Sequence, residues 1–149
     1  MSRNIGLITG AASGIGLKTV KRLLKKGWKI YGLDNDKNSL EQSSEEIDNC
    51  NFIAKPCDLR NEEALKNTFA EIQKDHQKIN ALIACAGVLK LGALEDMPTE
   101  DFDLIFDINV RGLWLSAREA LPLLKNAASG GELSRIILLS SVSALRPKI

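Results

Sequence analysis

The feature that most constrains the fold of this chain is a glycine-rich segment near its amino terminus. Residues 9–16 read Thr-Gly-Ala-Ala-Ser-Gly-Ile-Gly, between a short apolar run at 5–8 and an amphipathic helical pattern. A strand that turns directly into a helix brings backbone N–H groups and the positive helix terminus to a pyrophosphate. An ordinary strand-to-helix turn is the alternative interpretation. The candidate cofactor contacts in this segment are Gly10, Ser13, Gly14, Ile15 and Gly16.

Short apolar runs alternate with helix-period segments along the rest of the chain, which is typical of repeated βα units. We expect strands at 5–9, 28–33, 52–57, 79–85 and 135–139. Because these runs are apolar on both faces, they predict a Rossmann-like, doubly wound parallel sheet of about five strands, ordered 3-2-1-4-5. The length of 149 residues predicts a single nucleotide-binding domain spanning 1–149.

A long helix is expected between the fourth and fifth strands. It begins near Thr99 and runs toward Leu124, with Pro122 marking a kink near its end. Its apolar stripe includes Phe106, Val110 and Trp114.

Composition excludes several other classes of protein. The net charge is +1 and 44% of the residues are hydrophobic, so neither nucleic acid nor a membrane surface is an expected partner. The three cysteines lack C-x-x-C spacing and only one histidine is present, which argues against a disulfide framework or a metal site. The amino terminus has no apolar run of signal-peptide length, so we expect a cytoplasmic protein.

Asp34 is the candidate determinant of cofactor choice. It lies at the expected end of the second strand, 18 residues beyond Gly16. A carboxylate at this distance can accept hydrogen bonds from the adenosine ribose hydroxyls and would repel a 2′-phosphate. NAD is therefore favoured over NADP, although Lys37 lies close in sequence. A turn residue before Asn35-Asp36 is the alternative role.

The G-x-x-x-G-x-G spacing, taken with Asp34, resembles that of the short-chain dehydrogenase/reductase family, and the similarity covers the whole chain. The resemblance implies that Asp58, followed by Leu59, contacts the adenine; a solvent-facing loop acid is the alternative. Where the family usually shows Asn-Asn-Ala-Gly, this sequence has Ala-Cys-Ala-Gly at 84–87. Ala86 and Gly87 keep the backbone role, whereas the side-chain hydrogen bonds of the two asparagines are lost.

The resemblance also implies two catalytic residues. Asn109 matches the family asparagine of an active-site proton relay, and Ser141 matches the serine that orients the substrate oxygen; Ser143 is a weaker candidate. Each has a structural alternative: an amide that bonds backbone at a helix irregularity, and a hydroxyl that satisfies backbone groups after a strand.

The family's remaining catalytic pair, Tyr-x-x-x-Lys, has no counterpart in this sequence. The only tyrosine is Tyr31, and position 35 is an asparagine. We therefore expect a truncated product or fragment of a family member that retains little turnover, since general acid–base catalysis contributes about 10² to 10⁴ in rate.

Two functions remain open at this point. The resemblance implies an oxidoreductase that transfers hydride between NAD and a small-molecule alcohol or carbonyl substrate. The second is a non-catalytic nucleotide-binding module that retains the adenosine half-site. A homo-oligomer is expected in either case, because an exposed edge strand and uncovered apolar faces favour association, and the family counterpart of the long helix commonly packs between subunits.

Overall fold

The sheet has the predicted topology. The structure is a computed structural model that describes residues 3–141, and its five strands are parallel in the order β3-β2-β1-β4-β5. The central strand β1 pairs with β2 and β4, so that Leu7 lies between Tyr31 and Leu82. The strands are β1 (Ile5–Thr9), β2 (Lys29–Asp34), β3 (Phe52–Pro56), β4 (Ala81–Ala84) and β5 (Arg135–Leu138).

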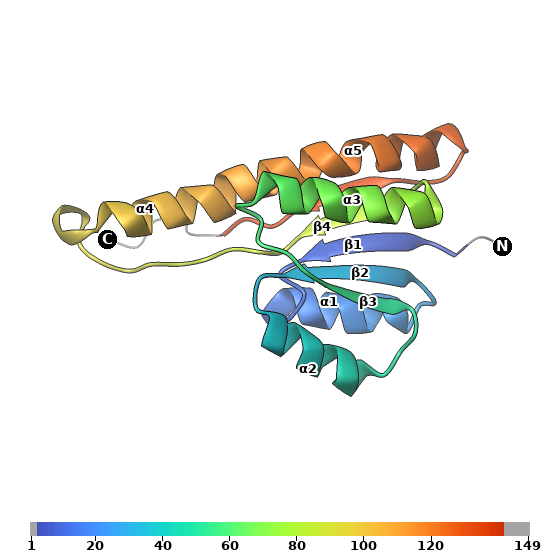
Figure 1. The fold of residues 1–149 in the computed structure, drawn as a ribbon, viewed down its shortest axis with the longest axis horizontal. Helices are drawn as coiled ribbons and strands as arrows, with labels where there is room; N and C mark the ends of the chain where they lie inside the picture. The colour runs from blue at the N-terminus through green and yellow to red at the C-terminus, as the bar shows by residue number, and fades with distance from the viewer. Residues whose placement is uncertain (1–2, 142–149) are drawn as a thin grey trace.

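Helices cover both faces of this sheet (Figure 1). The helices are α1 (Gly14–Leu24), α2 (Lys37–Ile47), α3 (Glu62–His76), α4 (Thr99–Phe106) and α5 (Leu113–Ser129). Figure 1 shows α3 and α5 on one side and α1 and α2 on the other. Successive side chains of a strand point to opposite faces of the sheet, so the strands contribute to two separate cores. Leu7 packs in the core with α3 and α5, whereas Ile8 packs in the core with α1 and α2.

The long helix predicted from Thr99 differs from expectation in two respects. A π-helical turn, η2 (Asp107–Gly112), interrupts it between α4 and α5. Pro122 lies inside α5, which continues to Ser129 instead of ending near Leu124. The irregularity therefore lies around Asn109.

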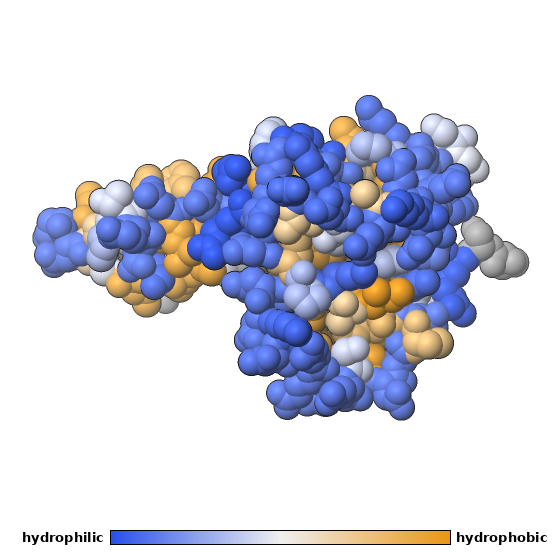
Figure 2. All heavy atoms as spheres, in the orientation of Figure 1, coloured by the Kyte–Doolittle hydropathy of each residue, from blue (hydrophilic) through white to orange (hydrophobic). Residues whose placement is uncertain are grey.

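The predicted apolar stripe of that helix faces solvent in this structure. Phe106, Val110 and Trp114 are 50%, 54% and 55% exposed. The residues of α5 that pack on the sheet and α3 belong to a second set, which includes Leu115 and Leu123. Figure 1 shows α4 projecting beyond the sheet, and Figure 2 shows apolar side chains on the surface of this projection.

Within residues 3–141, no helix has both the length and the apolar character needed to cross a membrane.

Candidate functional site

A pocket opens at the carboxyl edge of the sheet, where α1 begins. Its volume is about 340 Å³. It is lined by Gly10, Ser13, Gly14, Ile15, Gly16, Leu33, Asp34, Asn35, Cys57, Asp58, Leu59, Cys85, Ala86, Gly87, Val88 and Ile108. All ten residues predicted as cofactor contacts lie in this lining. Because the carboxyl ends of parallel strands meet at one edge, these ten residues converge there although they are up to 77 positions apart in the sequence.

The glycine-rich segment forms the wall of the pocket nearest α1. Gly10 and Gly14 have φ values of 68° and 51°, a region of backbone conformation that glycine adopts without strain. A Cβ at Gly10 would lie 2.8 Å from the backbone nitrogen of Ala86. The two loops therefore approach each other as closely as backbone allows. Gly14, Ile15 and Gly16, the first residues of α1, line the pocket, and the Ser13 side chain does not cap their amides, as a phosphate-binding helix terminus requires.

Asp34 links the glycine-rich segment to the end of β2. Its Oδ2 accepts a hydrogen bond of 3.0 Å from the Ala12 amide, and its Oδ1 accepts one of 3.1 Å from the Asp36 amide. A carboxylate offers about four acceptor positions, so two remain for further donors. The carboxylate of Asp34 thus has a structural role and still lines the pocket. Asp34 does not act as the turn residue alone.

Asp58 is held by the arginine two residues later. The Arg60 Nη2 and Nε lie 2.6 and 3.0 Å from Asp58 Oδ2, and the Arg60 amide donates to Oδ1. These hydrogen bonds lower the pKa of Asp58. The carboxylate is therefore ionised at neutral pH and acts only as an acceptor. Sequence reasoning missed Arg60, for which the Asp-Leu-Arg spacing was the available signal.

Asn109 holds the loop that follows β4. Its Oδ1 accepts a hydrogen bond of 2.8 Å from the Val88 amide, and its Nδ2 donates one of 2.9 Å to the Val88 carbonyl. A Cβ at Gly87 would lie 3.3 Å from the same Oδ1. Both polar ends of the Asn109 side chain therefore bond backbone, as in the structural alternative. Asn109 does not itself line the pocket, although its neighbour Ile108 does.

Residues 84–87, which lack the two asparagines usual in the family, are held by a hydrogen bond from their backbone to Thr9. The Thr9 hydroxyl oxygen accepts a hydrogen bond of 3.2 Å from the Ala86 amide. Cys85 lines the pocket, and burial raises the pKa of its thiol. The protonated thiol is a poor nucleophile, and Cys85 packs against the core shared with α1 and α2.

Ser141 lies three residues beyond the end of β5 at the same edge of the sheet. It is exposed and does not line the pocket. Ser143 falls outside the described residues. The structure therefore gathers the cofactor candidates in one place but does not bring Ser141 into that pocket.

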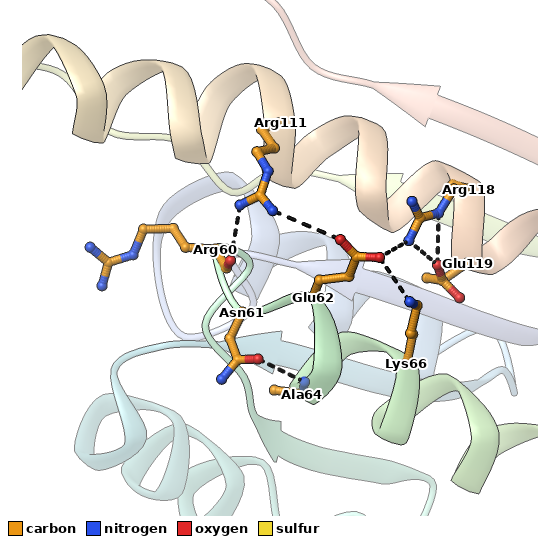
Figure 3. A network of polar contacts seen from close by, with 8 residues as sticks. All are labelled: Arg60, Asn61, Glu62, Ala64, Lys66, Arg111, Arg118 and Glu119. Carbon is orange, nitrogen blue, oxygen red and sulfur yellow. Dashed lines mark hydrogen bonds and ion pairs between the residues drawn. The ribbon is translucent and has the colours of Figure 1, made fainter.

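A network of ions joins the Asp58 loop to the π-helical turn (Figure 3). The Arg111 guanidinium donates to the Arg60 carbonyl at 3.2 Å and lies 3.8 Å from the Glu62 carboxylate. Lys66 and Arg118 are each 2.8 Å from the same carboxylate. Hydrogen bonds from Lys66 and Arg118 lower the pKa of Glu62 to about 2. Two parts of the site are thus tied together outside the pocket.

Similarity to known proteins agrees with this geometry. A family model described as short chain dehydrogenase matches residues 4–149. The chain is 33% identical over 142 residues to serine 3-dehydrogenase of Rhizobium radiobacter, covering 95% of this chain and 55% of that protein. It is 32% identical over 145 residues to the NAD-dependent glycerol dehydrogenase of Listeria innocua, again covering 95% and 55%.

Solved structures show the same likeness. The 3-ketoacyl-(acyl-carrier-protein) reductase of Brucella melitensis, crystallised with NADH, superposes with a TM-score of 0.90 at 30% identity. The match covers 97% of this chain and 60% of that one. The chain thus spans roughly half to three-fifths of the length of the relatives that it matches.

Proposed function

The chain belongs to the short-chain dehydrogenase family, and from this premise we propose that it binds NAD in the pocket at the carboxyl edge of the sheet. The observation that carries the proposal is the convergence of the ten candidate residues in that one pocket. The glycine-rich segment and the N-terminus of α1 would hold the diphosphate, and Asp58 would accept a hydrogen bond from the adenine amino group. The cofactor, when bound, supplies or accepts the hydride.

Asp34 is the proposed selector of NAD over NADP. Its carboxylate lines the pocket and keeps two acceptor positions beyond its bonds to Ala12 and Asp36. The 2′- and 3′-hydroxyls of a ribose could use both. The negative charge of Asp34 would repel a 2′-phosphate at the same place, and a carboxylate has no hydrogen to donate to it.

Titration calorimetry with NAD, NADP and ADP-ribose tests this proposal. We expect NAD to bind more tightly than NADP. Asp34→Asn keeps the shape of the side chain but removes its charge. It should weaken NAD binding about ten- to hundredfold and reduce the difference in affinity between NAD and NADP. Asp36→Asn is the matched control, because it removes the same charge outside the pocket and still permits capping of α2. NADP binding as tight as NAD would contradict the selection.

The oxidoreductase activity itself is also a proposal: NAD-linked hydride transfer to or from a small alcohol or carbonyl compound, with little turnover expected from residues 1–149, which contain no Tyr-x-x-x-Lys pair. NADH oxidation with a panel of aldehydes and ketones would measure it. Ser141 is the residue proposed to orient the substrate oxygen, and Asn109 the one proposed to support proton transfer.

A non-catalytic nucleotide-binding module is the second candidate for residues 1–149, and the position of the tyrosine within these residues bears on it. Tyr31, the only tyrosine of the sequence, is 1% exposed inside β2. Its hydroxyl lies 3.2 Å from the Asp75 carboxylate, and burial raises its pKa to about 12. It cannot serve as the proton donor of this pocket. Equal affinities for NAD and ADP-ribose, with no turnover of any substrate, would support the second candidate.

A further inference from the structure

A buried hydroxyl from α2 contacts the glycine-rich segment from behind. Ser43 is 5% exposed, and its Oγ donates a hydrogen bond of 3.2 Å to the carbonyl of Ala12. A serine inside a helix commonly bonds the carbonyl four residues earlier in its own helix. Ser43 bonds instead to a loop 31 residues away in sequence. None of the sequence patterns around the pocket includes this residue.

The Ala12 peptide groups are consequently held from two sides. The amide of Ala12 donates to Asp34 Oδ2 at 3.0 Å, while its carbonyl accepts from Ser43. The preceding amide, that of Ala11, donates to the Leu33 carbonyl at 3.1 Å. The first half of the glycine-rich segment is therefore fixed to β2 and α2 before any ligand binds.

Fixing the Ala12 carbonyl also fixes the next amide. In a planar trans peptide, the carbonyl of one residue and the N–H of the next point in opposite directions. Because the Ala12 carbonyl points toward Ser43 on α2, the Ser13 N–H points away from α2. Ser13 lines the pocket and directly precedes the first residue of α1. Its N–H is one of the donors that a helix N-terminus offers to an anion.

We infer that Ser43 is a positioning residue for diphosphate binding: through the Ala12 carbonyl, it orients the Ser13 amide toward the ligand. This inference rests on the proposed nucleotide site and adds to it a residue that touches no ligand. We expect the hydroxyl to act on the diphosphate part of the site, since Ser43 holds the peptide between Ala12 and Ser13, whereas Asp34 accepts from the peptide between Ala11 and Ala12.

The test compares two ligands that differ only in the diphosphate, ADP and adenosine, by titration calorimetry on the full chain. Ser43→Ala should weaken ADP binding about three- to tenfold and leave adenosine binding unchanged. Ser44→Ala is the matched control, because it removes the same hydroxyl from the next position of α2, about 100° around the helix. It should change neither affinity.

Amide NMR shifts give a second readout that a merely structural role would not move. ADP should shift the Ser13 amide strongly in the unaltered chain and in Ser44→Ala, and much less in Ser43→Ala. Should Ser43→Ala fail to fold, Ser43→Cys keeps the shape of the side chain with a larger atom and a weaker donor, and the same ratio of ADP to adenosine affinity is measured.

Three results would overturn the inference in distinguishable ways. Equal ADP affinity in Ser43→Ala and the unaltered chain removes the role of Ser43 and leaves the nucleotide site standing. Equal losses for ADP and adenosine show a general structural role. An unaltered chain that binds neither ligand refutes the proposed function itself.

Discussion

Several side chains at this site form hydrogen bonds with the protein's own backbone. Asp34 accepts two amides, and Asn109 uses both ends of its amide group on Val88. The sequence indicated Asp34 through its spacing from the glycine-rich segment, and Asn109 through the family resemblance. It could not indicate Ser43 or Thr9, since a serine in a polar helix and a threonine at a strand end carry no distinguishing pattern. Their roles depend on contacts across 31 and 77 residues.

At the same scale, we predict that the protein loses stability as pH falls through the range in which histidine titrates. His76, the only histidine, contacts the Tyr31 ring edge-on at 5.9 Å. Its Nε2 is buried and has no hydrogen-bond partner within residues 3–141. Burial, with the Lys29 charge added, lowers the pKa of His76, while Asp75 acts in the opposite direction.

The sign follows from proton binding. Below about pH 6.5, the pKa of a free histidine, the unfolded chain binds a proton that the folded chain resists, so acid favours unfolding. Urea unfolding at pH 7.5 and 5.5 should show a lower midpoint at pH 5.5. His76→Phe should remove most of that difference, because Phe cannot titrate. The same pH dependence in both proteins would show that another group is responsible.

Among the elements, the strands were easier to predict than the long helix. Strands that are apolar on both faces fit a parallel sheet covered by helices on both sides. All five predicted strands are present, and each of their ends lies within two residues of its predicted position. The region from Thr99 carries two apolar stripes, and sequence periodicity does not say which one meets the sheet. In the structure, the stripe that contains Leu115 and Leu123 is the one that packs against α3 and β4. The π-helical turn between α4 and α5 ends at Gly112, where a Cβ would lie 2.8 Å from the Leu59 Cβ.

The Glu62 network makes a prediction for the contact between α3 and α5. Glu62→Gln should lower the thermal midpoint at neutral pH and low salt, because Arg111 and Arg118 lose their shared carboxylate. The pKa of Glu62 is lowered to about 2, so this stabilisation is complete above about pH 4.5 and disappears as pH falls toward 2. High salt should also reduce the effect.

Calorimetry of Glu62→Gln and Glu63→Gln provides the comparison. Glu63 occupies the same first turn of α3 and is exposed, so it shares the interaction with the helix dipole but not the network. If Glu63→Gln lowers the thermal midpoint as much as Glu62→Gln does, the effect comes from the helix dipole and not from the network.

For the whole molecule, we propose that a second copy of the chain covers the apolar surface of α4 and α5. Phe102, Phe106, Val110 and Trp114 recur every four residues and are 49–55% exposed. A monomer seldom leaves such large apolar patches uncovered.

Sedimentation velocity over a range of concentrations tests this association. We expect a dimer or larger assembly, and Val110→Glu should shift it toward monomer by placing a charge within the apolar row. Lys125→Glu changes the charge of an exposed position on α5 outside that row and should leave the assembly unchanged. A species that stays monomeric at every concentration would refute the proposal.

The sequence by itself determined the βα order, the strand topology, the glycine-rich turn and the family, because these depend on local patterns of apolar residues and glycines. Of the ten candidate cofactor contacts, those in the glycine-rich segment and Asp34 were predicted from such patterns, whereas Asp58, Leu59, Ala86 and Gly87 were implied by the family resemblance. Only the tertiary structure decided which stripe of the long helix is buried, that Asn109 binds Val88, and that Ser43 holds the glycine-rich segment. Those outcomes depend on distances between residues far apart in the chain, and such distances are set by packing and leave no periodicity in the sequence.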